Sequence, residues 1–349
     1  MIHWEESVQR QLKYISAGTG RAGKVKVALY GIGVIGAAVA RATLSRRSLE
    51  VVGALDRDPH KVGRDLGELI GGGKVGIAVT DRPDALAGAQ VVVHTTGSSF
   101  KAVYPQLAEI VEAGANVVSS CEELAFPYLQ NPGLSGELSS LANRKGVTVF
   151  GTGVNPGFVM DALPVAVSGV VSDVRRVAVT RVVDAATRRG PLQKKIGSGM
   201  TPEAFEALAQ EGKIGHVGLV ESVALIAHCI GWTLEGVTET LDPVVSQEAI
   251  RTEHVQVAPG QVAGLHQTAA GLQGGQRVIE MDLTMRLNAP NARDEILVEG
   301  TPAVHLVIRG GTAGDPATVA ALLNAVPRVL DAPPGLLTAK ELLLPRSVG

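Results

Sequence analysis

A short apolar segment that leads directly into a glycine-rich turn constrains the fold of this chain more than any other feature. Residues 25–30 are apolar and rich in valine, and they are followed at once by a G-x-G-x-x-G sequence, Gly31-Ile32-Gly33-Val34-Ile35-Gly36. Good helix formers continue through residues 37–44. A second apolar segment, residues 49–55, ends at Asp56, twenty residues beyond the last motif glycine. This order of strand, glycine turn, helix, strand and acidic residue is typical of a dinucleotide-binding βαβ unit.

Each motif glycine has a separate physical role in such a unit. Gly31 permits the tight turn, Gly33 lets the backbone approach a pyrophosphate, and Gly36 lets the helix pack closely on the strand. The helix N-terminus offers N–H groups and a positive dipole end to the phosphates. The alternative is a tight turn that binds nothing, since glycine accounts for 42 of the 349 residues. From this unit we expect a cofactor site that includes Gly31, Ile32, Gly33, Val34, Ile35, Gly36 and Asp56.

Composition excludes several classes of partner. A net charge of −2 without a basic run argues against a nucleic-acid surface. No window approaches the roughly 18 apolar residues that a membrane span requires. Residues 1–24 are polar and lack the apolar core of a secretory signal, so we expect a polar arm or short helix there. Cys121 and Cys229 fit neither a disulfide framework nor a metal site, and a cytoplasmic protein without a bound metal is the natural expectation.

At 349 residues the chain is long for one hydrophobic core, so we expect two domains. The first half alternates predicted strands with predicted helices, which indicates an α/β fold with a Rossmann-type, doubly wound parallel sheet. The further strands expected in this sheet are residues 76–80, 89–94, 116–120 and 147–150. The helices expected between them are residues 82–87, 104–113 and 135–145.

The second half predicts an α+β domain with a largely antiparallel sheet, because residues 174–183, 278–287 and 303–309 alternate in polarity. Thr201 and Pro202 signal a helix start, and residues 219–230 form an apolar helix. Residues 316–330 predict an amphipathic helix that returns to the first domain. We therefore expect a dinucleotide-binding domain at 1–155, completed by 316–349, and a substrate and dimerisation domain at 156–315. An uncovered sheet face favours a homodimer, unless the helices of this domain bury the sheet within a monomer.

Ligands of an open parallel sheet bind beyond the carboxyl ends of its strands. The turn after His94 contains Thr95, Thr96 and Gly97, whose side chains are small enough for a cofactor to pass close to the backbone. His94 itself fits the core or the cofactor edge better than catalysis. Asn155 follows another strand and offers an amide to a carboxamide or to substrate, although a purely structural turn is equally consistent with Asn155-Pro156-Gly157.

Glu122 and Glu123 are adjacent carboxylates at the end of a predicted strand, where a nicotinamide would face its substrate. One of them near an apolar ring can bind an ammonium group or shuttle a proton. The alternative is that the pair caps a helix N-terminus. His216 opens the helix at 219–230 and can reach the substrate cleft, cap the helix or lie at an interface. The expected substrate pocket comprises Asn155, Pro156, Phe158, Met160 and His216.

Several segments together resemble a known group, the 2,4-diaminopentanoate dehydrogenases and native amine dehydrogenases of the dihydrodipicolinate reductase-like superfamily. They are Tyr30-Gly31-Ile32-Gly33, Lys61-Val62-Gly63-Arg64-Asp65-Leu66-Gly67-Glu68, Ser120-Cys121-Glu122-Glu123-Leu124 and Gly153-Val154-Asn155-Pro156-Gly157. The resemblance implies NAD(P)-dependent oxidative deamination of an amine, or reductive amination of a ketone or aldehyde with ammonia, usually in a dimer. It also implies that a glutamate after the Ser-Cys element carries catalysis, which falls on Glu122 or Glu123.

The substrate and the cofactor preference stay open at this point. Asp56 favours NAD through the ribose hydroxyls, whereas Arg57 favours NADP by pairing with a 2′-phosphate, so we expect dual use. A substrate carboxylate can be bound by one of several cations, Arg181, Arg188, Arg189, Lys194 or Lys195. The competing functions are a dihydrodipicolinate reductase-like NAD(P)H reductase that needs no ammonia and a dinucleotide-binding sensor without turnover.

Overall fold

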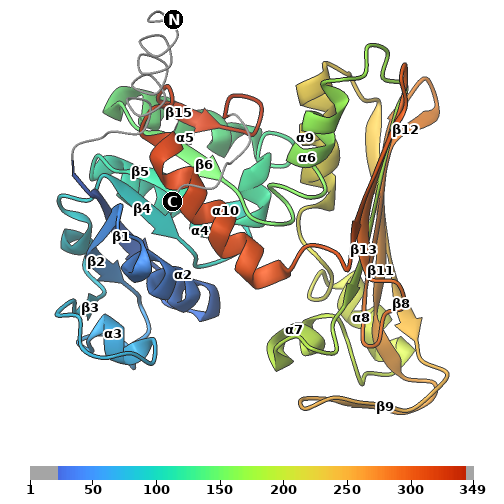
Figure 1. Cartoon of the computed structure of the whole chain (residues 1–349), viewed down its shortest axis with the longest axis horizontal. Coiled ribbons are helices and arrows are strands. Elements are labelled where there is room, and N and C mark those ends of the chain that lie inside the picture. Colours follow the sequence, from blue (N-terminus) through green and yellow to red (C-terminus); the bar gives the residue numbers. More distant parts are fainter. Residues whose placement is uncertain (1–22, 343–349) are drawn as a thin grey trace, which may run out of the picture.

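Two β-sheets, each with its own helices, make up the structure (Figure 1). It is a computed structural model that describes residues 23–342. The polar arm expected at residues 1–24 and the end of the 316–349 segment lie almost wholly outside the described residues. Among residues 23–342, no helix combines the length and apolarity needed to cross a bilayer.

The first sheet has seven parallel strands, and its topology confirms the Rossmann-type fold. In spatial order the strands are β15 (Gly335–Leu337), β6 (Thr148–Gly151), β5 (Asn116–Ser119), β4 (Val91–His94), β1 (Val25–Tyr30), β2 (Leu49–Leu55) and β3 (Val79–Thr80). The strand order reverses direction between β1 and β4. In a doubly wound sheet this reversal opens the crevice that receives the cofactor.

Helices cover both faces of the first sheet (Figure 1). They are α2 (Val34–Ser45), the short α3 (Leu66–Leu69), α4 (Phe100–Glu112), α5 (Pro132–Lys145) and α10 (Gly314–Val329), with 3₁₀ turns η1 (Pro83–Leu86) and η2 (Glu122–Ala125). One core cluster unites the sheet with Leu322 and Val326 of α10, and another unites it with Phe100 and Leu107 of α4. The chain therefore returns to the first sheet after it has built the second.

Two expected helices differ from the structure. Residues 82–87 form only a 3₁₀ turn, because the segment is too short for a stable α-helix. The helix expected at 104–113 begins at Phe100, four residues earlier, and Pro105 lies inside it. The Phe100 ring has no exposed surface, so its burial in the core extends the helix toward its N-terminus.

The second sheet is mixed but mostly antiparallel, as expected. Its strands in spatial order are β14 (Val304–Arg309), β13 (Arg293–Glu299), β7 (Arg176–Asp184), β12 (Gln276–Arg286), β11 (Val262–Gln273) and β8 (Gly236–Val245), and only β7 and β12 pair in parallel. A separate ribbon pairs β9 (Ile250–Arg251) with β10 (Gln256–Val257). Four helices, α6 (Ala162–Ser168), α7 (Gly190–Lys195), α8 (Pro202–Gln210) and α9 (Leu219–Ile230), complete this part of the chain. α6 and α9 lie between the two sheets (Figure 1).

Candidate active site

The glycine loop between β1 and α2 is packed so closely that side chains are excluded at two positions. A Cβ atom at Gly36 would lie 1.9 Å from the carbonyl oxygen of Gly31, and one at Gly31 would lie 2.7 Å from Thr96 Cγ2. Gly31 also has a φ of +93°, which L-residues with side chains rarely adopt. Gly33 has open space around the position of a Cβ. The loop is therefore closed toward the protein and open at Gly33.

The N-terminus of α2 is suited to a pyrophosphate. Its N-cap is Gly33, and within residues 23–342 no side chain hydrogen-bonds to the cap. The N–H groups of the first turn and the positive end of the helix dipole are then available to an anion. The closed loop, the open approach at Gly33 and the uncapped helix together fit a dinucleotide.

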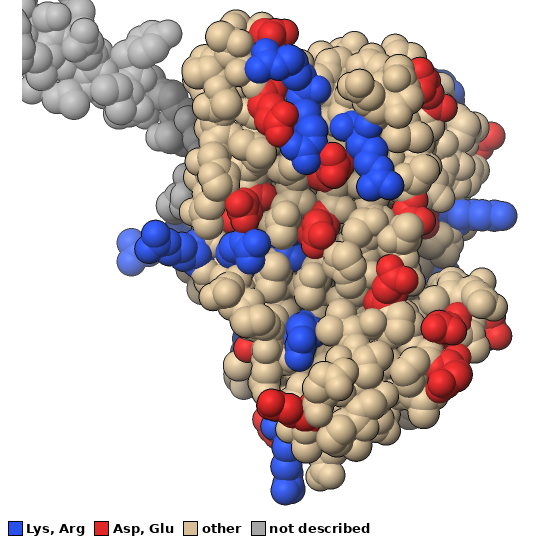
Figure 2. All heavy atoms as spheres, turned by 90° about the vertical axis from the view of Figure 1, so that its right-hand side faces the viewer, with Lys and Arg blue, Asp and Glu red and all other residues tan. Residues whose placement is uncertain are grey.

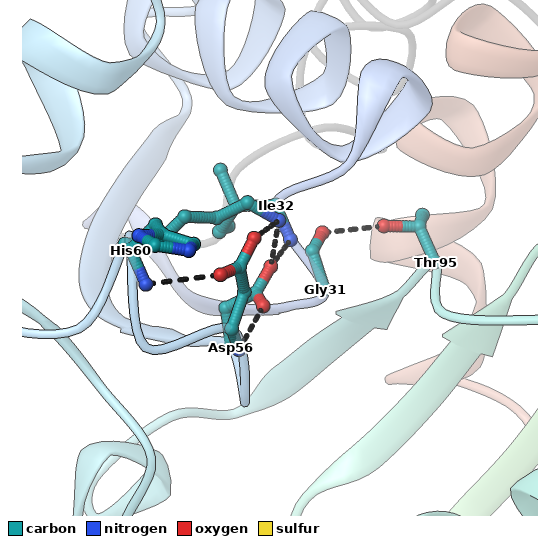
Figure 3. Close-up of polar contacts among 7 residues, drawn as sticks. Gly31, Ile32, Asp56, His60 and Thr95 are labelled. Atoms are coloured by element: carbon teal, nitrogen blue, oxygen red, sulfur yellow. Dashed lines mark hydrogen bonds and ion pairs between the residues drawn. The ribbon is translucent and has the colours of Figure 1, made fainter.

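Asp56 lies beneath the glycine loop at the end of β2 (Figure 3). Its Oδ2 accepts hydrogen bonds from the Ile32 N–H at 2.7 Å and from Lys61 Nζ at 2.9 Å, and its Oδ1 accepts one from the Asp58 N–H at 2.9 Å. Burial raises the pKa of Asp56, but these donors outweigh burial and hold the pKa below its usual value. Asp56 is thus an anion that fixes the loop and borders the expected ribose position.

Two cations flank Asp56. Lys61 pairs with it directly, whereas Arg57 has a side chain that is 61% exposed and lies 3.7 Å from Glu109. The Arg57 guanidinium is therefore only loosely held. Lys61 was not among the site residues expected from the sequence. Its position, five residues after Asp56, was the available sequence signal.

The turn after β4 closes the other side of the glycine loop (Figure 3). Thr95 Oγ1 donates to the carbonyl oxygen of Gly31 at 2.8 Å, while Thr96 Oγ1 bonds to His94. His94 is fully buried, and its two ring nitrogens lie within 2.9 Å of Ser119 Oγ and 2.8 Å of Gln106 Oε1. Burial lowers its pKa to about 4, so the imidazole is neutral at neutral pH. His94 is a core residue that supports the turn.

A cavity of about 390 Å³ lies where the two sheets face each other. Glu123 in η2 and Gln130 in the loop before α5 reach it from the first domain, and residues of the second sheet and its helices supply the remaining wall. The charged and polar side chains around it are Glu123, Gln130, Lys195, Lys213, His216, Glu221, Glu239, Thr240 and Gln267. No cluster of three or more potential metal ligands occurs in the described part of the chain.

Glu122 and Glu123 occupy different positions relative to this cavity. Glu123 lines it, and its Oε2 accepts hydrogen bonds from the Phe100 N–H at 2.6 Å and from Ser99 Oγ at 3.4 Å. One oxygen of Glu123 therefore caps the N-terminus of α4, as the structural alternative for this pair predicts, while the residue also lines the cavity. Glu122 is absent from the described residues that line the cavity.

Glu221 was not expected as a site residue. It lies on α9 with 1% of its surface exposed, and its Oε1 accepts a hydrogen bond of 2.5 Å from Gln130 Nε2. Oε2 is buried and has no hydrogen-bond partner among residues 23–342. Burial is the main cause that raises the pKa of Glu221 to about 7. The available sequence signal was one carboxylate within an otherwise apolar helix, Leu219–Ile230.

His216 lies in the cavity wall and is held through its backbone. Its N–H donates to Gln267 Oε1 and its carbonyl accepts from Gln267 Nε2, both at 2.8 Å. Burial, followed by Lys195 and Arg181, lowers the pKa of His216 to about 3, which leaves a neutral ring. Its Nε2 is buried without a partner in the described chain. The neutral ring can therefore donate or accept one hydrogen bond inside the cavity.

The other expected pocket residues lie outside the cavity wall. Met160 has no exposed surface and packs in the core of the second domain, with Phe158 against the same cluster. Pro156 packs beneath the start of α9, where a Cβ at Gly218 would lie 2.6 Å from its ring. Asn155 keeps a buried Oδ1 that has no partner within residues 23–342. An unpaired buried amide oxygen fits a carboxamide or another donor.

Most of the candidate cations for a substrate carboxylate are engaged elsewhere. Arg181 and Asp294 form a buried pair at 2.5 Å, and Arg188 and Arg189 both pair with Asp315 at the start of α10. Lys195 is the member of this group that lines the cavity. The arginines therefore serve the connection between the second sheet and α10.

Comparison with known proteins places this architecture in a family. The family model described as the 2,4-diaminopentanoate dehydrogenase C-terminal domain matches residues 158–349, and the N-terminus of dihydrodipicolinate reductase matches residues 25–121. A 2,4-diaminopentanoate dehydrogenase from Acetoanaerobium sticklandii is 32% identical, over 93% of this chain and 95% of its own. An amine dehydrogenase from Streptomyces virginiae is 22% identical, over 93% and 98% of the two chains. The structure of an amine dehydrogenase from Mycobacterium smegmatis superposes with a TM-score of 0.83 at 26% identity, covering 94% of this chain and 98% of that one.

Proposed function

The chain belongs to the 2,4-diaminopentanoate dehydrogenase family, and we propose that it oxidises a small amine that also carries a carboxylate, in the cavity between its two sheets. It is an NAD(P)-dependent oxidoreductase that acts on amine groups. In the oxidative direction, a substrate ammonium, the oxidised cofactor and water give a ketone or aldehyde, ammonium, the reduced cofactor and one proton. The reverse direction consumes ammonia.

The charges of the cavity wall carry the substrate proposal. Glu123, Glu221 and Glu239 line the cavity together with Lys195 and Lys213. The substrate named for the relative from Acetoanaerobium sticklandii, 2,4-diaminopentanoate, has two amino groups and one carboxylate. A wall with both carboxylates and ammonium groups complements such a molecule better than a simple alkyl amine, for which an apolar pocket is preferable.

The cofactor site supports the redox half of the proposal. The glycine loop and the N-terminus of α2 would hold the pyrophosphate, Asp56 would bind the ribose hydroxyls, and Arg57 and Lys61 are the cations beside Asp56 that could pair with a 2′-phosphate. Asn155 offers its buried amide oxygen to a carboxamide. When bound, the nicotinamide accepts the hydride from the carbon that carries the nitrogen.

Glu123 is the candidate of the adjacent pair that reaches the substrate. A carboxylate beside an ammonium group binds and orients it, and removal of an acid–base group lowers turnover by roughly 10²–10⁴-fold. Glu123→Gln should therefore lose activity by that order, while Glu122→Gln should retain most of it. Full activity in both variants would refute the assignment.

A panel of amines, each with NAD⁺ or NADP⁺, tests the function through absorbance of the reduced nicotinamide. We expect turnover with 2,4-diaminopentanoate or a related diamino acid, and much less with alkyl amines of the same length. The reverse assay supplies ketones with the reduced cofactor, with and without ammonium. Ketone reduction that does not depend on ammonium would favour a reductase, and no turnover with any amine or ketone would favour a binding protein.

The outer face of the second sheet supports a homodimer. Figure 2 looks onto this side of the molecule, which is largely uncharged with charges scattered over it. On β7, Ala178, Thr180 and Val182 point outward and alternate with the buried Val177 and Val179. Pairing of two such faces within residues 156–315 would cover the sheet, with residues 1–155 and α10 holding the cofactor in each chain. If light scattering at micromolar concentration gives the mass of a single chain, 36.1 kDa, the dimer is contradicted. We expect the protein to act in the cytoplasm.

A further inference from the structure

Glu221 combines deep burial with an oxygen, Oε2, that has no hydrogen-bond partner among residues 23–342. It is the third residue of α9, which begins after Gly218, and it points into the cavity that Glu123 enters from the other sheet. A buried carboxyl oxygen without a hydrogen bond is unfavourable in a folded protein. A ligand in the cavity that donates a hydrogen bond would remove this penalty.

Gln130 fixes the orientation of Glu221 through a direct hydrogen bond between the two domains. Its amide Nε2 donates to Oε1 of Glu221 at 2.5 Å, and the contact joins the first sheet to α9. The donor leaves Oε2 as the oxygen available to a ligand. The Gln130 residue is exposed, so its side chain can be replaced with little effect on the core.

We propose that Glu221 is a second acid–base carboxyl group of the site, which accepts a proton from the substrate ammonium through Oε2 while Gln130 positions it. The inference rests on the proposed amine dehydrogenase function. In the step, the ammonium N–H bond breaks, an O–H bond forms at Oε2, and the electron pair stays on nitrogen. The amine is then neutral, and its lone pair can assist departure of the hydride from the adjacent carbon. In reverse, the same O–H returns the proton.

Glu221 suits proton transfer better than Glu123 does. Protein donors hold one oxygen of each carboxylate, Oε2 of Glu123 by the Phe100 N–H and Ser99 Oγ and Oε1 of Glu221 by Gln130. The second oxygen of Glu221, Oε2, is buried without a donor among the described residues. Proton transfer is most efficient when the group is half ionised near the working pH. Burial brings the pKa of Glu221 to about 7. Two carboxylates in different environments can thus divide the work, one holding charge and one moving a proton.

The two acidic neighbours of Glu221 act on its pKa in the same direction as burial. Glu123 and Glu239 raise its pKa, and burial also raises the pKa of Glu239. The other titratable groups that face α9 or share the cavity are Asp161 at the start of α6, Lys195, Lys213, the neutral His216, and Lys340 and Glu341 at the C-terminal end of α9. A bound substrate ammonium adds a positive charge beside Oε2 and favours the ionised form before proton transfer.

The test is the pH profile of kcat/KM for amine oxidation by the complete protein. We expect the parent profile to rise with pH through a midpoint near 7, because Glu221 must be ionised to accept a proton. Glu221→Gln should lose this limb and lower kcat/KM by roughly 10²–10⁴-fold. Gln130→Ala should move the midpoint to higher pH, because its amide stabilises the ionised carboxylate. A merely structural role would leave the midpoint in place.

Two further measurements separate the outcomes. Fluorescence titration with the reduced cofactor should give the same affinity for the parent and Glu221→Gln. Infrared difference spectra between pH 6 and 8, without substrate, should show the C=O band of a protonated carboxyl that Glu221→Gln lacks. Glu206→Gln, an exposed glutamate of α8, is the matched control and should behave as the parent.

Retention of the parent rate and of the limb near pH 7 by Glu221→Gln would overturn the inference and leave the proposed function intact. If Glu221→Gln fails to bind the cofactor, the Gln130→Ala variant decides. An unchanged midpoint of its kcat/KM pH profile would overturn the inferred role of Glu221. A parent protein that oxidises no amine would instead refute the proposed function.

Discussion

Replacement of Glu221 by Gln should make the folded protein more stable at pH 8 than the parent, although it removes activity. Gln has nearly the shape of Glu, and its side-chain oxygen can still accept the hydrogen bond from Gln130. The parent must bury a negative charge as Glu221 ionises, whereas the variant stays neutral. Functional groups in unfavourable environments commonly reduce stability in this way.

The magnitude follows from the pKa of Glu221, which burial raises from 4.5 to about 7 in the folded protein. Between these values the folded state binds more protons than the unfolded state, so the free energy of unfolding falls as pH rises. Between pH 5 and pH 8 the parent should lose about 2.5 kcal/mol that the variant keeps, at about 1.36 kcal/mol per pKa unit. The melting temperature of the variant should gain roughly 3 °C over the parent across this range.

Thermal or urea unfolding at the two pH values, without cofactor, measures the effect. Every other titrating group is common to both proteins. The comparison therefore uses the difference in the free energy of unfolding between variant and parent, and how much this difference changes from pH 5 to pH 8. Glu206→Gln controls for loss of an exposed carboxylate. An unchanged difference between parent and Glu221→Gln at both pH values would show that the buried carboxyl is not raised in pKa, and a larger advantage at pH 5 would reverse the reasoning.

Three other substitutions test the cofactor site and the connection between the sheets. Gly36→Ala should weaken cofactor binding about tenfold or more in fluorescence titration, because its Cβ would meet the Gly31 carbonyl oxygen at 1.9 Å; unchanged affinity would contradict the close packing. Arg57→Ala should weaken NADP binding about tenfold and leave NAD binding nearly unchanged, and equal effects would remove Arg57 from cofactor discrimination. Asp294→Ala should lower the free energy of unfolding by about 3–5 kcal/mol in urea, because it leaves Arg181 buried and unpaired, and a loss below about 1 kcal/mol would contradict this.

The first sheet was predictable because its signals are local. Buried parallel strands are continuous apolar runs, and the turns between them contain glycine, so the strands from β1 to β6 were expected near their observed positions. β15 was missed because it has only three residues and adds to the edge of the sheet. Its assignment as a strand depends on pairing with β6, which no local pattern reveals.

The second sheet was only partly predictable. The sequence indicated β7, β12 and β14 by alternation, but β8 and β11 lack that pattern. β11 is buried on most of its length and contains Gly264 and Gly271, where Cβ atoms would collide with Met285 and Leu234. Glycine has a low preference for strands, but close packing leaves no room for a side chain at these two positions. Tertiary contacts therefore override the β-propensity of the residues.

The site was predictable where its residues follow strands and unpredictable where it depends on the second domain. The glycine loop and Asp56 come from one βαβ unit, and Glu123 lies in the turn η2 that follows β5 of the same sheet. Glu221 lies in an apolar helix, and the sequence alone does not indicate which helix position faces another domain across a cavity. The reverse error occurred at Met160, which the sequence predicted for the substrate pocket. The structure buries it in the core, and the sequence alone does not separate an apolar pocket residue from a core residue.

The arginines of the second domain fix how the two halves of the cavity meet. Arg181 bonds to Asp294 and to the Thr312 carbonyl, while Arg188 and Arg189 hold Asp315, so the segment that leads into α10 is anchored at both ends. The cations that line the cavity are lysines, Lys195 and Lys213, so under the proposed function a lysine rather than an arginine would bind the substrate carboxylate, as a point charge. A lysine on a flexible stem imposes less geometry than an arginine. Selectivity for an amine should therefore depend more on the two carboxylates Glu123 and Glu221, which come from different domains and line the same cavity.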